Sequence, residues 1–139
     1  MPRYVYEGPR WYRTRIRSRG PFVALLPPAV LGLLAVAFLE AGDSQASGYA
    51  GLLLGVFAAP ALLAVGVPFS STSVIPIGIA LSVLLWLIVG AIAAHRTTRD
   101  PMATWSDYWR TYWWLAVGIW VGALAALAVA RFVVGDALV

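Results

Sequence analysis

The sequence predicts an all-α integral membrane protein in which four transmembrane helices form a compact bundle. Three observations indicate this fold class. The chain of 139 residues is 61% hydrophobic and only 12% charged, about half the charged fraction of a soluble domain. Four apolar runs of about 18 to 22 residues are each long enough to cross a hydrocarbon core of roughly 30 Å. A dense run of Trp and Tyr, typical of a membrane–water interface, precedes the last of them.

The apolar runs define the domain organisation. Residues 1–20 form a basic cytoplasmic or interfacial tail, and residues 21–139 form a single transmembrane domain. The acidic, flexible stretch 40–48 is too polar for hydrocarbon and marks an exposed turn. We expect transmembrane spans at about 21–40, 50–67, 74–94 and 113–134.

The fourth helix is expected to begin before it enters the hydrocarbon, as an aromatic interfacial turn. Thr104 followed three residues later by Asp107 resembles a capping box, with Asp replacing the usual Glu or Gln. Asp107 and Arg110 lie three residues apart, which favours a local ion pair on one helical face. In this turn we expect contact with lipid headgroups from Trp105, Trp109, Arg110 and Trp113.

The tail concentrates positive charge beside the first span. Its alternating arginines follow a period of two, which matches no helical stripe, so we expect an extended or interfacial segment. Such a cluster sets orientation and contacts anionic lipid, and we expect no nucleic-acid partner. The tail residues expected at the headgroups are Arg10, Trp11, Arg13, Arg15, Arg17 and Arg19.

Small residues at a period of four mark helix-packing faces within the spans, and Pro60 is expected to kink the second one. Such stripes pack helices within one chain or between subunits, and the motif does not identify which. The residues assigned to helix packing are Gly51, Gly55, Gly78, Gly90, Gly118, Gly122 and Ala126.

Four crossings with a cytoplasmic tail place both termini in the cytoplasm. All ten basic residues are Arg, a usage typical of a GC-rich prokaryotic genome, so the expected location is the inner (plasma) membrane. This orientation leaves Arg96, Arg99 and Arg110 outside, against the usual charge bias. The alternative keeps both basic segments cytoplasmic and makes the proline-rich stretch 60–76 a re-entrant element.

Few residues could carry chemistry. The chain has no Cys and a single histidine, His95, which cannot by itself assemble a typical metal site. A surface enzyme using His95, Asp100 and Asp107 is the weakest hypothesis, because these residues form no recognised motif. We therefore expect no catalytic residues, cofactor or metal.

The absence of ionisable residues at the centres of the spans counts against proton relays and transporter sites. The favoured hypothesis is a small non-catalytic accessory or scaffolding subunit that packs against other membrane protein subunits. The alternative is a small homo-oligomeric transporter or channel with a path near 60–76, where Pro60, Pro68 and Pro76 break the helices. The expected polar lining of that path is Ser70, Ser71, Thr72 and Ser73.

Overall fold

The computed structural model describes residues 9–64 and 72–137, and this part of the chain folds into helices without strands. Predictions for residues 1–8, 65–71 and 138–139, including Ser70 and Ser71 of the expected path, lie outside the described residues, as does the side chain of Thr72. The elements are α1 (Pro9–Val23), α2 (Leu26–Ala41), α3 (Gln45–Ala58), α4 (Ala61–Ala64), the 3-10 helix η2 (Thr72–Val74), α5 (Ile75–Thr97) and α6 (Trp105–Ala137).

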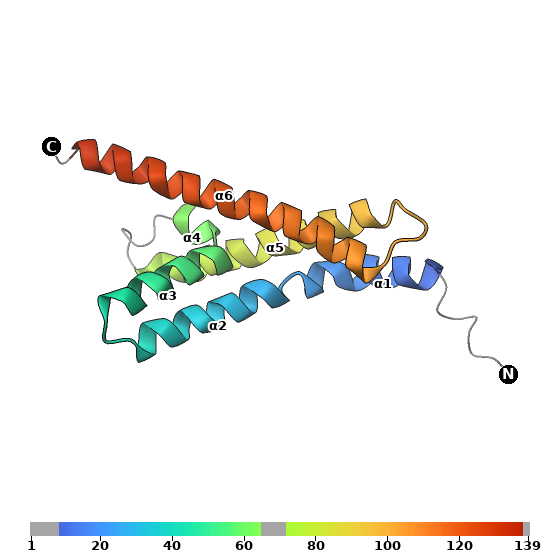
Figure 1. Ribbon diagram of the computed structural model, residues 1–139, viewed down its shortest axis with the longest axis horizontal. Helices are drawn as coiled ribbons and strands as arrows, with labels where there is room; N and C mark the ends of the chain where they lie inside the picture. The colour runs from blue at the N-terminus through green and yellow to red at the C-terminus, as the bar shows by residue number, and fades with distance from the viewer. Residues whose placement is uncertain (1–8, 65–71, 138–139) are drawn as a thin grey trace.

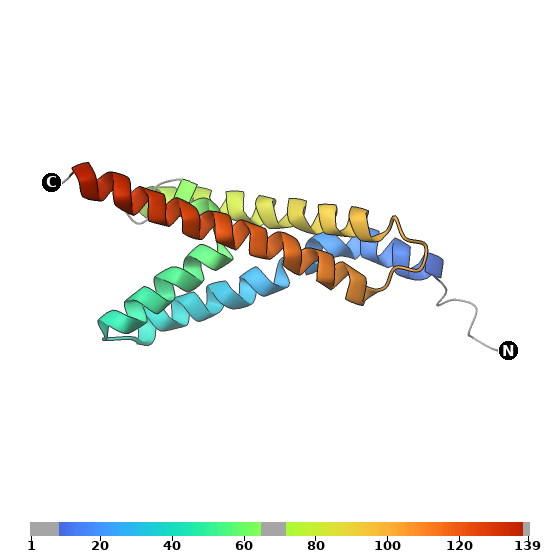
Figure 2. The ribbon, with the colours of Figure 1, turned by 45° about the horizontal axis from the view of Figure 1, so that its top comes forward.

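Two long antiparallel helices, α5 and α6, run the length of the molecule (Figure 1). Helix α1 packs beside them at the end where the turn between α5 and α6 lies. Helices α2 and α3 form a hairpin that leans away from α6 in the second view (Figure 2). The C-terminal end of α3 therefore reaches only the middle of the long pair.

Three helical segments are long and apolar enough to cross a membrane, so one of the four expected spans, the second at 50–67, is not confirmed. The three are Arg10–Ala41 with 32 residues, Ile75–Thr97 with 23 and Trp105–Gly135 with 31. Helix α3 has 14 residues, fewer than the roughly 20 that a span requires. Pro60 ends this helix instead of kinking it. Ala59, directly before the proline, leaves the helical region at φ −134 and ψ 70, as steric clash with the proline ring requires.

Residues 9–20 of the basic tail are helical, so the expectation of an extended segment was wrong there. Ile16 and Gly20 are buried four residues apart on one face of α1, and Ala24, directly after the helix, continues the same spacing and is also buried. Pro27 and Pro28 then separate α1 from α2, because both lack the N–H that continues a helix. Helix α2 starts with the two prolines in its first turn.

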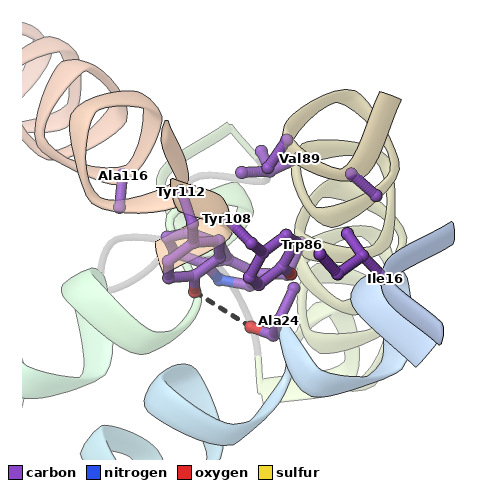
Figure 3. Packing of buried hydrophobic residues seen from close by; sticks show 9 residues of the cluster. Ile16, Ala24, Trp86, Val89, Tyr108, Tyr112 and Ala116 are labelled. Carbon is purple, nitrogen blue, oxygen red and sulfur yellow. Dashed lines mark hydrogen bonds between the residues drawn. The ribbon is translucent and has the colours of Figure 1, made fainter. Parts of the chain in front are cut away.

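The core lies where α1, α5 and α6 meet (Figure 3). At this junction glycine permits close approach, since a Cβ on Gly90 would lie 2.5 Å from the Cβ of Ala24 and 2.8 Å from the Cα of Pro21. The buried cluster is Ile16, Ala24, Trp86, Val89, Ala93, Ala94, Tyr108, Tyr112 and Ala116.

Replacing Gly90 with alanine is expected to destabilise the junction by about 1–3 kcal/mol, because the new methyl group meets backbone as well as side chain. The measurement is the free energy of unfolding of purified protein in mixed detergent. Gly122→Ala is the matched control, since a Cβ there has no neighbour within 4 Å. Equal stability of the two variants would contradict the packing described.

Candidate functional site

Prolines break the helices at two places, before α2 and after α3, and backbone polar groups there lose their helical partners. In an apolar medium an unpaired carbonyl costs several kcal/mol, so each group that loses its helical partner needs another donor. Side chains of α6 supply those donors at the first break, and side chains of α5 and α6 supply them at the second.

At the first break, tyrosines of α6 donate to backbone carbonyls at the end of α1 and in the turn that follows it. A regular helix would pair the carbonyl of Ala24 with the N–H of residue 28, which Pro28 lacks. The hydroxyl of Tyr112 donates to this carbonyl oxygen at 2.9 Å, the dashed line in Figure 3. The hydroxyl of Tyr108 donates to the carbonyl oxygen of Gly20 at 2.5 Å, and that oxygen also accepts from the N–H of Ala24 at 3.0 Å.

At the second break, two indoles bond the end of α3. The carbonyl of Ala58 accepts from Nε1 of Trp86 at 2.8 Å, and that of Phe57 accepts from Nε1 of Trp120 at 3.1 Å. Both carbonyls have lost their helical donors, because the chain turns at Ala59.

The N–H groups freed by the same turn are also paired. Leu62 donates to the carbonyl of Ala59 at 3.0 Å, and Ala61 donates to Oγ of Ser82 at 3.1 Å. The hydroxyl of Ser82, which is 2% exposed, donates in turn to the carbonyl of Gly78 at 2.8 Å. Ser82 thus links α4 to the first turns of α5.

Ring contacts join the two breaks into one aromatic cluster. The ring centroid of Trp86 lies 6.0 Å from that of Tyr112 and 6.4 Å from that of Trp120. Trp120 also lies 5.6 Å from Phe57 at the end of α3. The cluster can hold the first break, the end of α3 and the α5–α6 pair together. Its hydroxyl and indole N–H groups donate to the backbone carbonyls of Ala24, Ala58 and Phe57.

The aromatic run expected at the interface divides into two faces. Tyr108 and Tyr112 are completely buried, whereas Trp105 and Trp109 are half-buried and Trp113 is 43% exposed. Sequence reasoning placed the whole run among headgroups and missed the two tyrosines. Their four-residue spacing, continued by the buried Ala116, is the signal that would have identified them.

The capping contact at the start of α6 is present, with both Thr104 groups donating to the Asp107 carboxylate. The backbone N–H and the hydroxyl each lie 3.0 Å from Oδ2. Arg110 is exposed on the following turn.

The tail arginines lie in three different environments. Arg13 and Arg17 both donate through Nε to Thr98, in the turn between α5 and α6. Arg10 and Arg19 are exposed.

Arg15 instead packs over the ring of Trp11, with its Cζ 4.2 Å from the ring centroid. This cation–π contact lies within α1, so Arg15 does not join the pair at Thr98.

The small-residue stripes also differ from one another. On α3, a Cβ at Gly51 would lie 2.7 Å from Leu39, and one at Gly55 would lie 4.0 Å from the Cβ of Ala35, so this stripe faces α2. Gly78 and Gly90 are buried on α5.

The stripe on α6 faces away from the other helices. Gly118, Gly122 and Ala126 are exposed, and a Cβ at either glycine would have no neighbour within 4 Å. This stripe therefore packs against no helix of the same chain in the described structure.

The three residues of the enzyme hypothesis do not form a metal-binding group. Among residues 9–64 and 72–137, no three His, Cys, Asp or Glu side chains are placed to hold a metal ion. Asp100 accepts from the N–H of Met102 at 2.9 Å, and Asp107 is used by Thr104. His95 is exposed.

The fold and the apolar helices define the class of this chain as an all-helical protein suited by length and composition to a membrane. Comparison with known proteins gave no matching family model, no matching curated protein and no matching solved structure.

Tyr112→Phe is expected to cost about 1–3 kcal/mol of folding free energy, because it leaves the carbonyl of Ala24 buried without a donor. Tyr108→Phe is expected to cost only about 0.5–1.5 kcal/mol, because the carbonyl of Gly20 keeps the N–H of Ala24. Each change removes one hydroxyl and leaves the ring in place. Unfolding free energies of both variants measured in one detergent mixture provide the comparison.

The double variant Pro28→Ala with Tyr112→Phe serves as the control. Alanine restores an N–H four residues after Ala24, so the loss in the double variant should be smaller than the sum of the single losses. Additive losses, or a larger cost for Tyr108→Phe, would show that the proline does not create the need for Tyr112.

Proposed function

We propose that the protein is a small non-catalytic integral membrane protein of a prokaryotic inner (plasma) membrane, acting as an accessory or scaffolding subunit of a larger membrane complex. The outward stripe of α6, formed by Gly118, Gly122 and Ala126, is the observation that carries this proposal. Small residues allow another transmembrane helix to approach closely. Residues 128–135 of the same helix are exposed throughout, so α6 offers a long uncovered surface.

The interior supports a scaffolding role better than a transport role. Transporters with broken helices use unwound carbonyls and helix ends to coordinate ions. Here the carbonyls of Phe57 and Ala58 are bonded by the indoles of Trp120 and Trp86. Those two oxygens are therefore engaged at the point where a transport path would need ligands.

The arrangement of the basic segments supports the re-entrant topology over four crossings. Four crossings place the tail and residues 95–104 on opposite faces of the bilayer. Yet Nε of Arg13 lies 3.1 Å from the carbonyl oxygen of Thr98, and Nε of Arg17 lies 3.2 Å from its Oγ1. Groups at hydrogen-bonding distance cannot be separated by roughly 30 Å of hydrocarbon.

We therefore infer three crossings, with the chain entering partway along α3, so that the re-entrant element begins at Gln45, earlier than the stretch 60–76 expected from the sequence. The tail and the turn at Arg99 are then cytoplasmic, in keeping with the positive-inside bias, while the turn at Asp43 and the end of α6 lie outside. The non-helical backbone near Ala59 is covered by α5 and α6, as such backbone must be at membrane depth.

Single-cysteine labelling distinguishes the two topologies, and the absence of Cys from the chain removes any background. With a membrane-impermeant maleimide on intact cells, Arg99→Cys should stay unlabelled, because three crossings place it in the cytoplasm. Asp43→Cys should be labelled in either topology and serves as the positive control. Labelling of Arg99→Cys after permeabilisation shows that its thiol is reactive. Labelling of Arg99→Cys in intact cells to the level of Asp43→Cys would contradict the three-crossing arrangement.

Adding bulk to the outward stripe should release the partner and leave the fold intact. Replacing Gly118 and Gly122 together with leucine is expected to reduce the co-purifying membrane subunits by roughly tenfold, through an overpacking cost of about 1–3 kcal/mol at the contact. Gly48→Leu is the matched control, because a Cβ there also meets open space. The yield of each subunit relative to the chain, measured after mild-detergent purification from native membranes, provides the readout.

A stable wild-type monomer without any stoichiometric partner would contradict the accessory role. So would a double-leucine variant that keeps its partner, provided that its unfolding free energy matches the wild-type value.

A further inference from the structure

Two arginines of α1 are held by one residue of the turn between α5 and α6. Arg13 and Arg17 lie four residues apart, on one face of the helix. Their Nε groups donate to the carbonyl oxygen and the Oγ1 of Thr98, at 3.1 and 3.2 Å. Thr98 is 0% exposed, and its hydroxyl donates to the carbonyl of Ala94 at 2.7 Å. Both guanidinium groups are thus oriented by a buried anchor.

The terminal nitrogens of these two guanidinium groups have no hydrogen-bond partner among residues 9–64 and 72–137. An arginine carries five N–H donors, and within this part of the chain each side chain is bonded through its Nε alone, to Thr98. Among the described residues, no carboxylate pairs with Arg13 or Arg17. The nearest acidic residues in sequence to Thr98 are Asp100 and Asp107, whose carboxylates accept from backbone N–H groups of Met102 and Thr104.

The pair lies just before the first apolar run, which is the level of the lipid phosphates when that run crosses a bilayer, as in the proposed function. Arg17 is four residues, about 6 Å of helix, before Pro21, where the first apolar run begins. The start of α6 lies at the same end of the molecule as α1 (Figure 1), and its first turns carry Trp105 and Trp109. Guanidinium groups match phosphate oxygens in bidentate geometry, and aromatic rings at this level anchor headgroups.

We propose that Arg13 and Arg17, positioned by Thr98, form a binding site for the phosphate group of an anionic lipid. Each guanidinium directs its free N–H donors to the phosphate oxygens, while the acyl chains extend along the apolar surface of the bundle. This site does not depend on the docking surface proposed for α6. Arg10, Arg15 and Arg19 contribute only diffuse charge, since none of them is tied to Thr98.

The test measures lipid binding to the purified full chain in a neutral detergent. Native mass spectrometry quantifies adducts during titration with phosphatidylglycerol, and phosphatidylcholine is the zwitterionic comparison. The variant Arg13→Gln with Arg17→Gln should weaken phosphatidylglycerol binding by about tenfold or more, because charge-assisted hydrogen bonds are lost. The control, Arg15→Gln with Arg19→Gln, removes the same charge from the same helix and should change binding less than threefold. Equal losses in the two double variants would overturn the proposal, since they would indicate a general charge effect.

A second pair of variants separates geometry from charge and from misfolding. Arg13→Lys with Arg17→Lys keeps both charges but loses the planar fork, so binding should still fall several-fold. Unchanged binding in the lysine variant would overturn the site. Thr98→Val removes the hydroxyl that orients Arg17 and should weaken binding, whereas Thr98→Ser should restore it. If the Thr98→Ser variant unfolds with the wild-type free energy but does not bind lipid as the wild type does, Thr98 does not position the site.

Inorganic phosphate distinguishes a lipid from a free anion as the source of the phosphate group. If a lipid is the ligand, millimolar phosphate should not displace phosphatidylglycerol, because the acyl chains add apolar contact that the free anion lacks. Displacement that depends on Arg13 and Arg17 would keep the phosphate site and identify the free anion as its ligand. Equal binding of phosphatidylcholine and phosphatidylglycerol to the wild-type chain would overturn selection for an anionic lipid.

Discussion

The structure depends on one requirement: every backbone carbonyl in an apolar region needs a hydrogen-bond donor. Prolines remove helical donors at two places, before α2 and after α3. Tyr112 replaces the donor that Pro28 lacks, and Trp86 and Trp120 bond the carbonyls exposed where Pro60 ends α3. Each donor belongs to α5 or α6, so satisfying the breaks also docks the first half of the chain onto the second.

This coupling explains how the interior and exterior of the molecule differ. Inside, hydroxyl and indole groups are engaged with backbone, and Ser82 links α4 to α5 by accepting from Ala61 and donating to Gly78. Outside, α6 carries a small-residue stripe with no neighbour in the described part of the chain, and the basic end carries guanidinium donors that no described residue uses. Groups available to other molecules are therefore on the outer surface, in keeping with a protein that binds neighbours and lipid.

The sequence-based predictions were confirmed where the backbone groups of a helix are hydrogen-bonded within that helix. The run expected at 74–94 corresponds to α5, Ile75–Thr97, and the aromatic extension of the fourth run corresponds to the start of α6 at Trp105. The predictions were wrong where contacts between residues far apart in the sequence determine the structure. The tail from Pro9 is helical because Ile16 and Gly20 pack against the long pair, a pattern obscured by the arginines between them. The second run stops at Ala58, and the indoles of Trp86 and Trp120 bond the carbonyls that the end of the helix leaves without helical partners.

By itself, the sequence determined the properties that depend on composition and on neighbours a few residues apart. These are the helical class, the apolar lengths suited to a membrane, and the cap at Thr104. Only the tertiary structure decided which glycine stripe is covered, that Pro60 ends a helix, and that Arg13 and Arg17 share Thr98. These outcomes join residues that are 81 and 85 positions apart for the arginines, and 28 apart for Trp86 and Ala58. Local periodicity cannot specify such pairs, because a helix presents its faces without indicating which neighbour will cover them.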